Sequence, residues 1–247
     1  MPKPWYVEGF GEHYLELYAH RNEREAELAM ALLARVTPPL TGQRVLDLGC
    51  GGGRHLAALG RRGAHALGLD LSWPLLDAAR GRLRPGLHLL RGDMRRLPLA
   101  DCSVDGAVSM FTSFGYFARD EENWQVPAEV ARVLAPGGWF FFDFFNRAQL
   151  ERSLEARGVR ESRHWRAEEE RSIEADRVVK RVAVRPLAGG ETVHYEESVR
   201  LFTPDELVDG FARLGLAESG RWGDYRGGAF DPERSARLIL LLTRAAS

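Results

Sequence analysis

Residues 45–55 hold the feature that most constrains how this chain folds. An apolar run that contains Asp47 is followed by glycine at every second position (Gly49, Gly51, Gly53) and then by helical spacing. A strand, a tight turn and a helix start in this order bring a ligand against bare backbone. A second apolar run ends in Asp70, placed at the tip of the neighbouring parallel strand to accept hydrogen bonds from both hydroxyls of a ribose. The pattern predicts a site for a nucleoside-containing cofactor.

The spacing of the glycines narrows the choice of nucleoside. A dinucleotide fold has the pattern G-x-G-x-x-G, whose third glycine lets the helix pack closely beside a pyrophosphate. Counted from Gly49, the third position is Arg54, and counted from Gly51 it is Leu56. Since neither is glycine, the sequence argues against a nicotinamide-dependent oxidoreductase.

Asp47 and the three glycines form D-x-G-x-G-x-G, which resembles motif I of the class I S-adenosylmethionine-dependent methyltransferases. The resemblance continues in order along residues 42–145, through segments 87–94, 104–117 and 130–142. It implies an α/β fold, a three-layer Rossmann-like sheet of seven mostly parallel strands with an antiparallel last strand. It also implies S-adenosylmethionine as the cofactor and S-adenosylhomocysteine as its product.

The resemblance further implies which side chains meet the cofactor. Asp70 would hold the ribose, Asp93 the adenine amino group, and Met94 would pack on the adenine ring. Phe111, in the loop after the fourth strand, is expected to line the methyl-transfer channel. The full set of expected cofactor contacts is Tyr14, Asp47, Gly49, Cys50, Gly51, Gly53, Arg54, Asp70, Leu71, Asp93, Met94 and Phe111.

Three of these contacts have alternatives. Tyr14, followed by Tyr18 four residues later, either closes over the methionyl end of the cofactor or anchors the first helix on the core. Arg54 either meets the cofactor carboxylate or faces solvent at a helix start. Cys50 is expected to pack in the glycine turn rather than to react, and His55 to pack behind it.

Beyond the cofactor core, three further segments complete one expected domain over residues 1–247. Apolar spacing predicts a helix over 12–36. Between 158 and 202, charged and apolar residues alternate around a glycine pair, which predicts an inserted antiparallel platform with one covered face. Residues 203–247 begin with Thr203-Pro204, a helix start, and supply the last strands.

Composition limits the partners. The 247 residues are 45% apolar, enough for one full core, and the formal net charge of −1 gives no reason to expect a nucleic-acid partner. The chain has no run of about 18 apolar residues, so we expect no membrane partner and a cytoplasmic location. Cys50 and Cys102 have no disulfide or metal-ligand spacing, so no metal is expected. The oligomeric state stays open.

Methyl transfer is an in-line displacement, so holding the acceptor in line matters more than supplying a strong base. Segment 109–117 lacks the Asn/Asp-Pro-Pro-Tyr/Phe pattern of enzymes that methylate nucleobase amino groups. Together with the platform, it resembles small-molecule methyltransferases, including sugar-amine and glycine N-methyltransferases. We therefore expect a small-molecule acceptor of unknown identity. The alternatives are a methyltransferase for RNA or protein and a non-catalytic S-adenosylmethionine-binding protein.

Each catalytic candidate has a structural alternative. Tyr116 either binds the acceptor or covers the pocket, and His164 is either a base near neutral pH or a surface residue. Asp143 follows the fifth strand, at the edge where such sheets bind ligands. Glu168–Glu170 is expected to be a solvated edge or an acidic patch that receives a cationic amine. Other polar residues expected near a substrate are Asn146, Tyr195 and Arg200.

Overall fold

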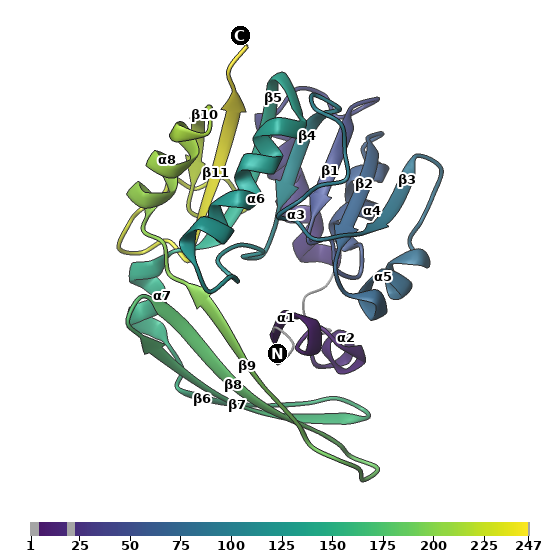
Figure 1. Cartoon of the computed structure of the whole chain (residues 1–247), viewed down its shortest axis with the longest axis vertical. Helices are drawn as coiled ribbons and strands as arrows, with labels where there is room; N and C mark the ends of the chain where they lie inside the picture. Colours follow the sequence, from purple (N-terminus) through teal and green to yellow (C-terminus); the bar gives the residue numbers. More distant parts are fainter. Residues whose placement is uncertain (1–4, 19–22, 247) are drawn as a thin grey trace.

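Seven strands form the central sheet of the computed structural model, which describes residues 5–18 and 23–246. Their order across the sheet is β10-β11-β5-β4-β1-β2-β3 (Figure 1). β1 to β5 are parallel to their neighbours in that group, whereas β11 is antiparallel to both β5 and β10. The expected mostly parallel sheet with an antiparallel last strand is confirmed. The strands are β1 Arg44–Leu48, β2 His65–Asp70, β3 Leu87–Arg91, β4 Val104–Ser109, β5 Leu134–Phe145, β10 Leu216–Trp222 and β11 Arg237–Arg244.

Apolar side chains alternate between the two faces of this sheet, and each face carries helices. Val45 and Phe141 belong to the core cluster that includes α3 and α4, whereas Leu46 and Phe142 belong to the cluster that includes α6 and α8. Full burial of a side chain such as Phe142 contributes about 1.5–3 kcal/mol. The three-layer architecture is therefore confirmed. The helices around the sheet are α3 Glu23–Val36, α4 Arg54–Arg61, α5 Trp73–Arg80, α6 Asp120–Val133 and α8 Pro204–Arg213.

The order of the parallel strands reverses at β1, which lies between β2 and β4. In open α/β sheets, ligands bind at the carboxyl ends of the strands beside such a switch point. The glycine turn follows β1, and Asp70 is the last residue of β2. The two features that the sequence singles out therefore lie at one edge of the sheet.

The expected helix over 12–36 is divided. α2 (Glu12–Leu17) ends before Tyr18, which lies in a turn, and α3 begins at Glu23, while residues 19–22 lie outside the described residues. The division follows from packing, because α2 contacts α5 and the inserted sheet, whereas α3 contacts α4 in the core. A shorter helix, α1 (Trp5–Glu8), precedes α2. In the described part of the chain, no helix has the length and apolar character needed to cross a membrane.

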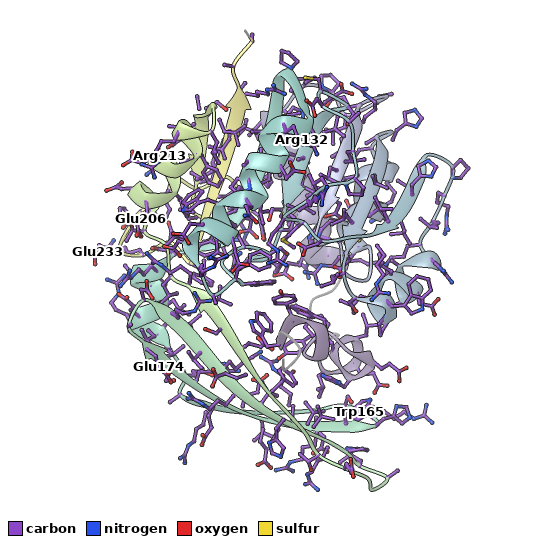
Figure 2. All side chains as sticks on the ribbon, in the orientation of Figure 1. Arg132, Trp165, Glu174, Glu206, Arg213 and Glu233 are labelled. Carbon is purple, nitrogen blue, oxygen red and sulfur yellow. The ribbon has the colours of Figure 1, made fainter. Side chains whose placement is uncertain are left out.

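The insertion is a four-stranded antiparallel sheet, as the alternating pattern predicts, and we call it the platform. One face packs through Ala167, Val182 and Tyr195 against Leu17 and Tyr18 at the end of α2. Figure 1 shows α1 and α2 between the platform and the central sheet, and Figure 2 shows Trp165 on the platform. The platform strands are β6 Arg157–Glu161, β7 Trp165–Glu174, β8 Arg177–Pro186 and β9 Val193–Arg200, and α7 Arg147–Ser153 leads into them.

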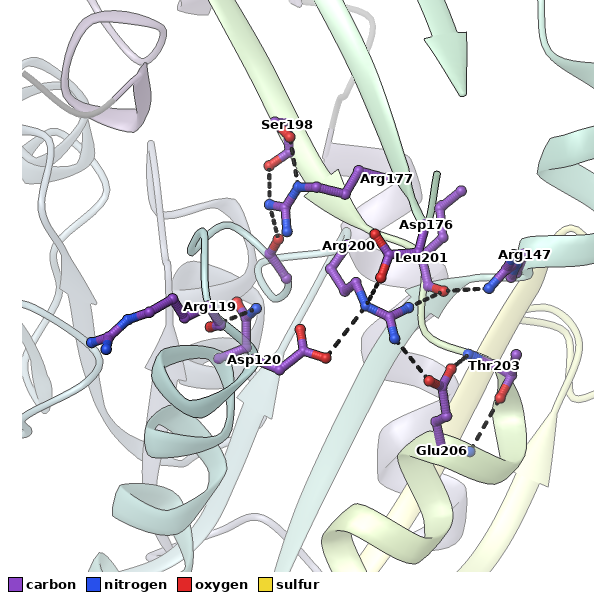
Figure 3. Close-up of polar contacts among 12 residues, drawn as sticks. Arg119, Asp120, Arg147, Asp176, Arg177, Ser198, Arg200, Leu201, Thr203 and Glu206 are labelled. Carbon is purple, nitrogen blue, oxygen red and sulfur yellow. Dashed lines mark hydrogen bonds and ion pairs between the residues drawn. The ribbon is translucent and has the colours of Figure 1, made fainter. Parts of the chain in front are cut away.

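Arg200, the last residue of β9, joins the platform to the helices of the core. Its guanidinium lies 2.8 Å from Asp176 in the β7–β8 turn, 3.4 Å from Asp120 at the start of α6 and 2.8 Å from Glu206 in α8 (Figure 3). Glu206 also accepts a hydrogen bond from the backbone N–H of Thr203, which completes the capping box of α8. Arg200 is thus a structural residue, and the expectation that it reaches a substrate is wrong.

Candidate active site

The glycine turn after β1 runs through left-handed backbone. Gly49, Gly51 and Gly53 have φ values of 69°, 52° and 77°. A Cβ at Gly49 would lie 2.9 Å from Oγ of Ser113, and one at Gly53 would lie 3.0 Å from Cβ of Ala79. Both the backbone conformation and the close neighbours therefore require glycine, as the sequence pattern indicates.

Asp70 faces this turn from the end of β2. One carboxylate oxygen accepts a hydrogen bond from the N–H of Gly51 at 2.8 Å, and the other accepts one from the N–H of Ser72 at 2.8 Å. Burial raises the pKa of Asp70, although these backbone hydrogen bonds oppose the shift. Each carboxylate oxygen has two lone pairs, so each can accept one more donor. Asp70 is therefore fixed in place with capacity for a diol.

Asp47 lies beneath the turn and does not reach the cavity. It is 1% exposed, and no hydrogen-bond partner among the described residues reaches its Oδ2. Burial, and secondly the negative charge of Asp70, raise the pKa of Asp47 to about 7, although a hydrogen bond with the backbone of Leu56 opposes the shift. Its burial and its hydrogen bond with the backbone of Leu56 indicate that Asp47 shapes the turn rather than contacting a ligand.

Asp93 follows β3 and is held by Arg95. The Arg95 guanidinium approaches Asp93 to 2.6 Å, also pairs with Glu122 at 2.9 Å and stacks 4.4 Å above the ring of Phe117. Burial alone would raise the pKa of Asp93, but the hydrogen bonds and charge of Arg95 outweigh it and hold that pKa below its usual value. Arg95 therefore fixes the orientation of the Asp93 carboxylate at the cavity.

A cavity of about 790 Å³ opens at this edge of the sheet. Its size is within the range typical of small-molecule sites, roughly 300–1,000 Å³. Among the expected contacts, Asp47, Gly53, Asp143 and His164 do not line it. The expected residues that line it are Tyr14, Gly49, Cys50, Gly51, Arg54, Asp70, Leu71, Asp93, Met94, Phe111 and Tyr116.

Phe111 and Thr112, in the loop after β4, adopt left-handed backbone with φ values of 55° and 66°. Asp143 holds them there, because its Oδ2 accepts the N–H of Phe111 at 2.7 Å and its backbone oxygen accepts the N–H of Thr112 at 3.1 Å. Strained backbone of this kind is common at functional sites. His55 stacks on the Phe111 ring, as its expected packing role predicts, and the Arg54 guanidinium lies 4.3 Å from the centre of that ring.

Asp143 is a structural acid. It is 0% exposed and accepts hydrogen bonds from the hydroxyl of Tyr225 at 2.6 Å and from Nε of Arg237 at 2.8 Å. Asn146 is likewise buried and donates to the backbone oxygens of Pro232 and Ser235. These partners are 82 or more residues away along the chain. The sequence placed Asp143 at the correct edge but could not show that its oxygens are occupied.

The platform supplies the wall of the cavity opposite the glycine turn. Arg171, Lys180 and Glu197 line the cavity from three neighbouring strands, together with Val178 and Val199. Sequence reasoning missed these charged residues. The sequence does contain a signal for Lys180. Residues two apart lie on one face of a strand, so Lys180 shares the covered face of β8 with Val178 and Val182.

His164 lies outside the cavity. Its ring pairs with Glu16 of α2 at 2.9 Å, and 59% of its side chain is exposed. Glu169, expected at a solvated edge, is instead buried with its side chain 0% exposed, whereas Glu168 and Glu170 on the other face are exposed. Cys50 is buried, as expected for a packing role. The described residues include no group of three or more potential metal ligands.

The fold and this edge of the sheet define the class of protein, and comparisons with known proteins agree. A methyltransferase domain family model matches residues 45–138. Cypemycin N-terminal methyltransferase of Streptomyces sp is 30% identical over 213 residues, which are 83% of this chain and 85% of that protein. The chain belongs to the class I S-adenosylmethionine-dependent methyltransferase family.

Two other relatives show how the similarity is distributed. Ubiquinone biosynthesis O-methyltransferase of Paracidovorax citrulli is 38% identical over 116 residues, but the match covers only 44% of this chain and 46% of that protein. The chain thus matches about half the length of that relative. The structure of S-adenosylmethionine-bound CalS10, an amino pentose methyltransferase from Micromonospora echinaspora, has a TM-score of 0.65 and 25% identity, covering 92% of this chain and 94% of that one.

The residues of this chain fit the family's cofactor, S-adenosylmethionine, whose sulfonium carries an activated methyl group. Asp70 retains acceptor capacity for two ribose hydroxyls, and Asp93 lies on the same cavity beside Met94. Gly49 and Gly51 line the cavity with backbone that carries no side chain. Acids that face the cavity from neighbouring strand ends can thus hold the two ends of an adenosine.

Proposed function

We propose that this protein transfers a methyl group from S-adenosylmethionine to a small-molecule acceptor held between the sheet edge and the platform. One observation carries the proposal: a single cavity of about 790 Å³ is lined both by the glycine turn with Asp70 and by platform residues such as Lys180. In-line displacement requires the acceptor and the methyl donor on one axis in one enclosed space. Such orientation contributes roughly 7–11 kcal/mol to lowering the barrier.

Nitrogen is the acceptor atom that the relatives favour. Two of the proteins that align over most of both chains are named for an N-terminal methyltransferase and an amino pentose methyltransferase. The ubiquinone O-methyltransferase matches only about half of its own length. The open platform half of the cavity favours an enzyme over a non-catalytic binding protein. A cytoplasmic location and the absence of a nucleic-acid partner stay predictions.

Calorimetry with S-adenosylhomocysteine tests the cofactor half of this proposal. We expect saturable binding of S-adenosylhomocysteine and none of NADH, because the turn lacks the third glycine of a dinucleotide site. Methyl transfer is then measured as S-adenosylhomocysteine released in the presence of candidate amines. Folded protein that shows no heat with millimolar S-adenosylhomocysteine would disprove the proposed function.

A further inference from the structure

The platform places a strip of charge in the wall of the cavity. Arg171, Lys180 and Glu197 line the cavity from β7, β8 and β9, with side chains 19%, 15% and 17% exposed. Val178 and Val199 line the same wall, so the strip interrupts an apolar surface. Charges that are largely removed from water are costly unless they are paired. The pairing of each group therefore decides what it can offer to an acceptor.

The two cations of the strip are committed to protein acids. Arg171 pairs with Glu169, whose buried carboxylate also contacts Arg160 at 3.1 Å and accepts the hydroxyl hydrogen of Tyr18 at 2.6 Å. Lys180 lies 2.7 Å from Oε2 of Glu197 and donates to the Tyr18 oxygen at 2.9 Å. Burial, and then the charges of the two glutamates, raise the pKa of Tyr18, so it stays a donor. This network holds Glu197 in place.

Glu197 itself keeps an acceptor facing the cavity. Its Oε2 pairs with Lys180, and no hydrogen bond from the described residues reaches its Oε1. The other carboxylates among the described lining residues are Glu23, Asp70 and Asp93, which lie on the sheet side of the cavity. Asp70 is held by backbone N–H groups, Asp93 by Arg95 and Glu23 by Arg82. On the platform side, Glu197 is therefore the carboxylate available to an acceptor.

We propose that Glu197 binds the acceptor as a protonated amine and takes its proton, with Lys180 and Tyr18 as positioning residues. This inference rests on the proposed function. An ammonium group has no lone pair, so it first gives one N–H proton to the Glu197 carboxylate. The freed lone pair forms the new N–C bond as the methyl carbon's bond to sulfur breaks, with its electron pair left on sulfur. The product leaves as a methylated ammonium, and the carboxylic acid returns its proton to water.

The rest of the wall indicates the body of the amine. Val178, Val199 and Leu150 line the cavity beside the strip, and the Tyr116 ring packs against Trp5 of α1 with centroids 4.9 Å apart. Apolar and aromatic walls around one available carboxylate favour an amine on a compact apolar or aromatic body. Benzylamine has this chemistry, and benzyl alcohol and benzoate are matched probes that change only the polar group.

Binding to protein saturated with S-adenosylhomocysteine is the first test. We expect benzylamine to bind more tightly than benzyl alcohol or benzoate, and Glu197→Gln to weaken benzylamine binding about tenfold, the scale of one lost charge-assisted hydrogen bond. Glu196→Gln is the matched control. Glu196 is the neighbouring residue on the outer face of β9, 51% exposed and paired with Arg181.

The pH profile of methyl transfer to benzylamine separates proton transfer from a structural role. Loss of a general base lowers the rate by roughly 10²–10⁴-fold. We expect that loss for Glu197→Gln at neutral pH, with recovery as pH rises towards the pKa of the free amine. The inference would be overturned if Glu197→Gln lowered the rate equally at all pH values. It would also be overturned if benzoate bound more tightly than benzylamine, or if none of the three probes bound. Failure to bind S-adenosylhomocysteine would instead overturn the proposed function.

Discussion

At the scale of single residues, we propose that Asp70 holds the ribose of the cofactor. Its two oxygens are oriented by the N–H groups of Gly51 and Ser72, and each keeps a lone pair that can accept a hydrogen bond from one hydroxyl of a diol. We expect Asp70→Ala to weaken S-adenosylhomocysteine binding at least tenfold, which corresponds to about 1.4 kcal/mol. Calorimetry measures the change, and Asp77→Ala on the exposed side of α5 is the control. Unchanged affinity in a folded Asp70→Ala protein would contradict the role.

Asp47 should make stability depend on pH near neutrality. Its pKa rises from 3.8 to about 7, first through burial and then through Asp70. Because the folded pKa is above the unfolded one, its contribution to stability is fully present below about pH 4 and is lost as pH rises through about 7. We expect the stability of wild type relative to Asp47→Asn to fall by roughly 2–4 kcal/mol between these values.

Urea unfolding of the two proteins at several pH values measures this difference. Asp105→Asn is a suitable control, because the Arg44 partner lowers the pKa of Asp105 and its contribution stays constant above the unfolded pKa. A difference between wild type and Asp47→Asn that does not change with pH would show that Asp47 does not titrate in this range.

At the level of elements, Arg237 joins β11 to the loop after β4. It pairs with the fully buried Asp143 and donates to Oγ1 of Thr112 at 3.2 Å. Removing one partner of a buried ion pair costs about 3–5 kcal/mol. We expect Arg237→Met to lose stability on this scale and to weaken S-adenosylhomocysteine binding, since Phe111 and Thr112 lose their support. Urea unfolding measures the loss of stability, and Arg234→Met, at an exposed residue, is the control. A loss below about 1 kcal/mol in Arg237→Met would contradict the proposed role of this ion pair.

The sequence predicts the parallel strands closely because their signal is local. An apolar run that ends in an acid or a glycine marks both the strand and its end, which is why Asp70 and the glycine turn are found directly. Asp143 and Glu169 show where that reasoning stops. Each looks like a polar residue at an edge, and only partners far along the chain, such as Arg237 or Tyr18, make it buried and structural.

The platform shows the same limit for function. Alternation along 178–184 predicts its covered face, but the identity of what covers it is not in the pattern. Lys180 on that face is a charged residue in an apolar series. Its role is visible only in the folded chain, where it pairs with Glu197 of β9 and donates to the hydroxyl of Tyr18 in the turn after α2. Charged exceptions on a covered face are therefore the positions to examine first in a sequence of this kind.

For the whole molecule, the cavity is closed by three parts of the chain that meet only after folding. The sheet edge supplies Asp70, the platform supplies Lys180, and the N-terminal segment supplies Trp5 from α1, Phe10 from the turn after it and Tyr14 from α2. Ser72 links the sheet edge to the N-terminal segment by a hydrogen bond, because it donates its hydroxyl to the backbone oxygen of Phe10 at 2.7 Å while its N–H holds Asp70. A ligand bound to Asp70 is therefore expected to stabilise Ser72 and, through it, the hydrogen bond that holds the N-terminal helices.

This linkage predicts that cofactor binding orders the N-terminal helices. Ligand binding stabilises the folded protein by about 2.7 kcal/mol when the ligand concentration is 100 times the dissociation constant. Local opening that breaks the site must overcome this additional stability. We expect S-adenosylhomocysteine to slow amide hydrogen exchange at residues 5–17 as well as at 49–56, with β10 unchanged as internal control. In Ser72→Ala, protection should persist at 49–56 and decline at 5–17, because the hydroxyl that joins Asp70 to Phe10 is gone. Equal protection of 5–17 in both proteins would show that the helices close independently of this bond.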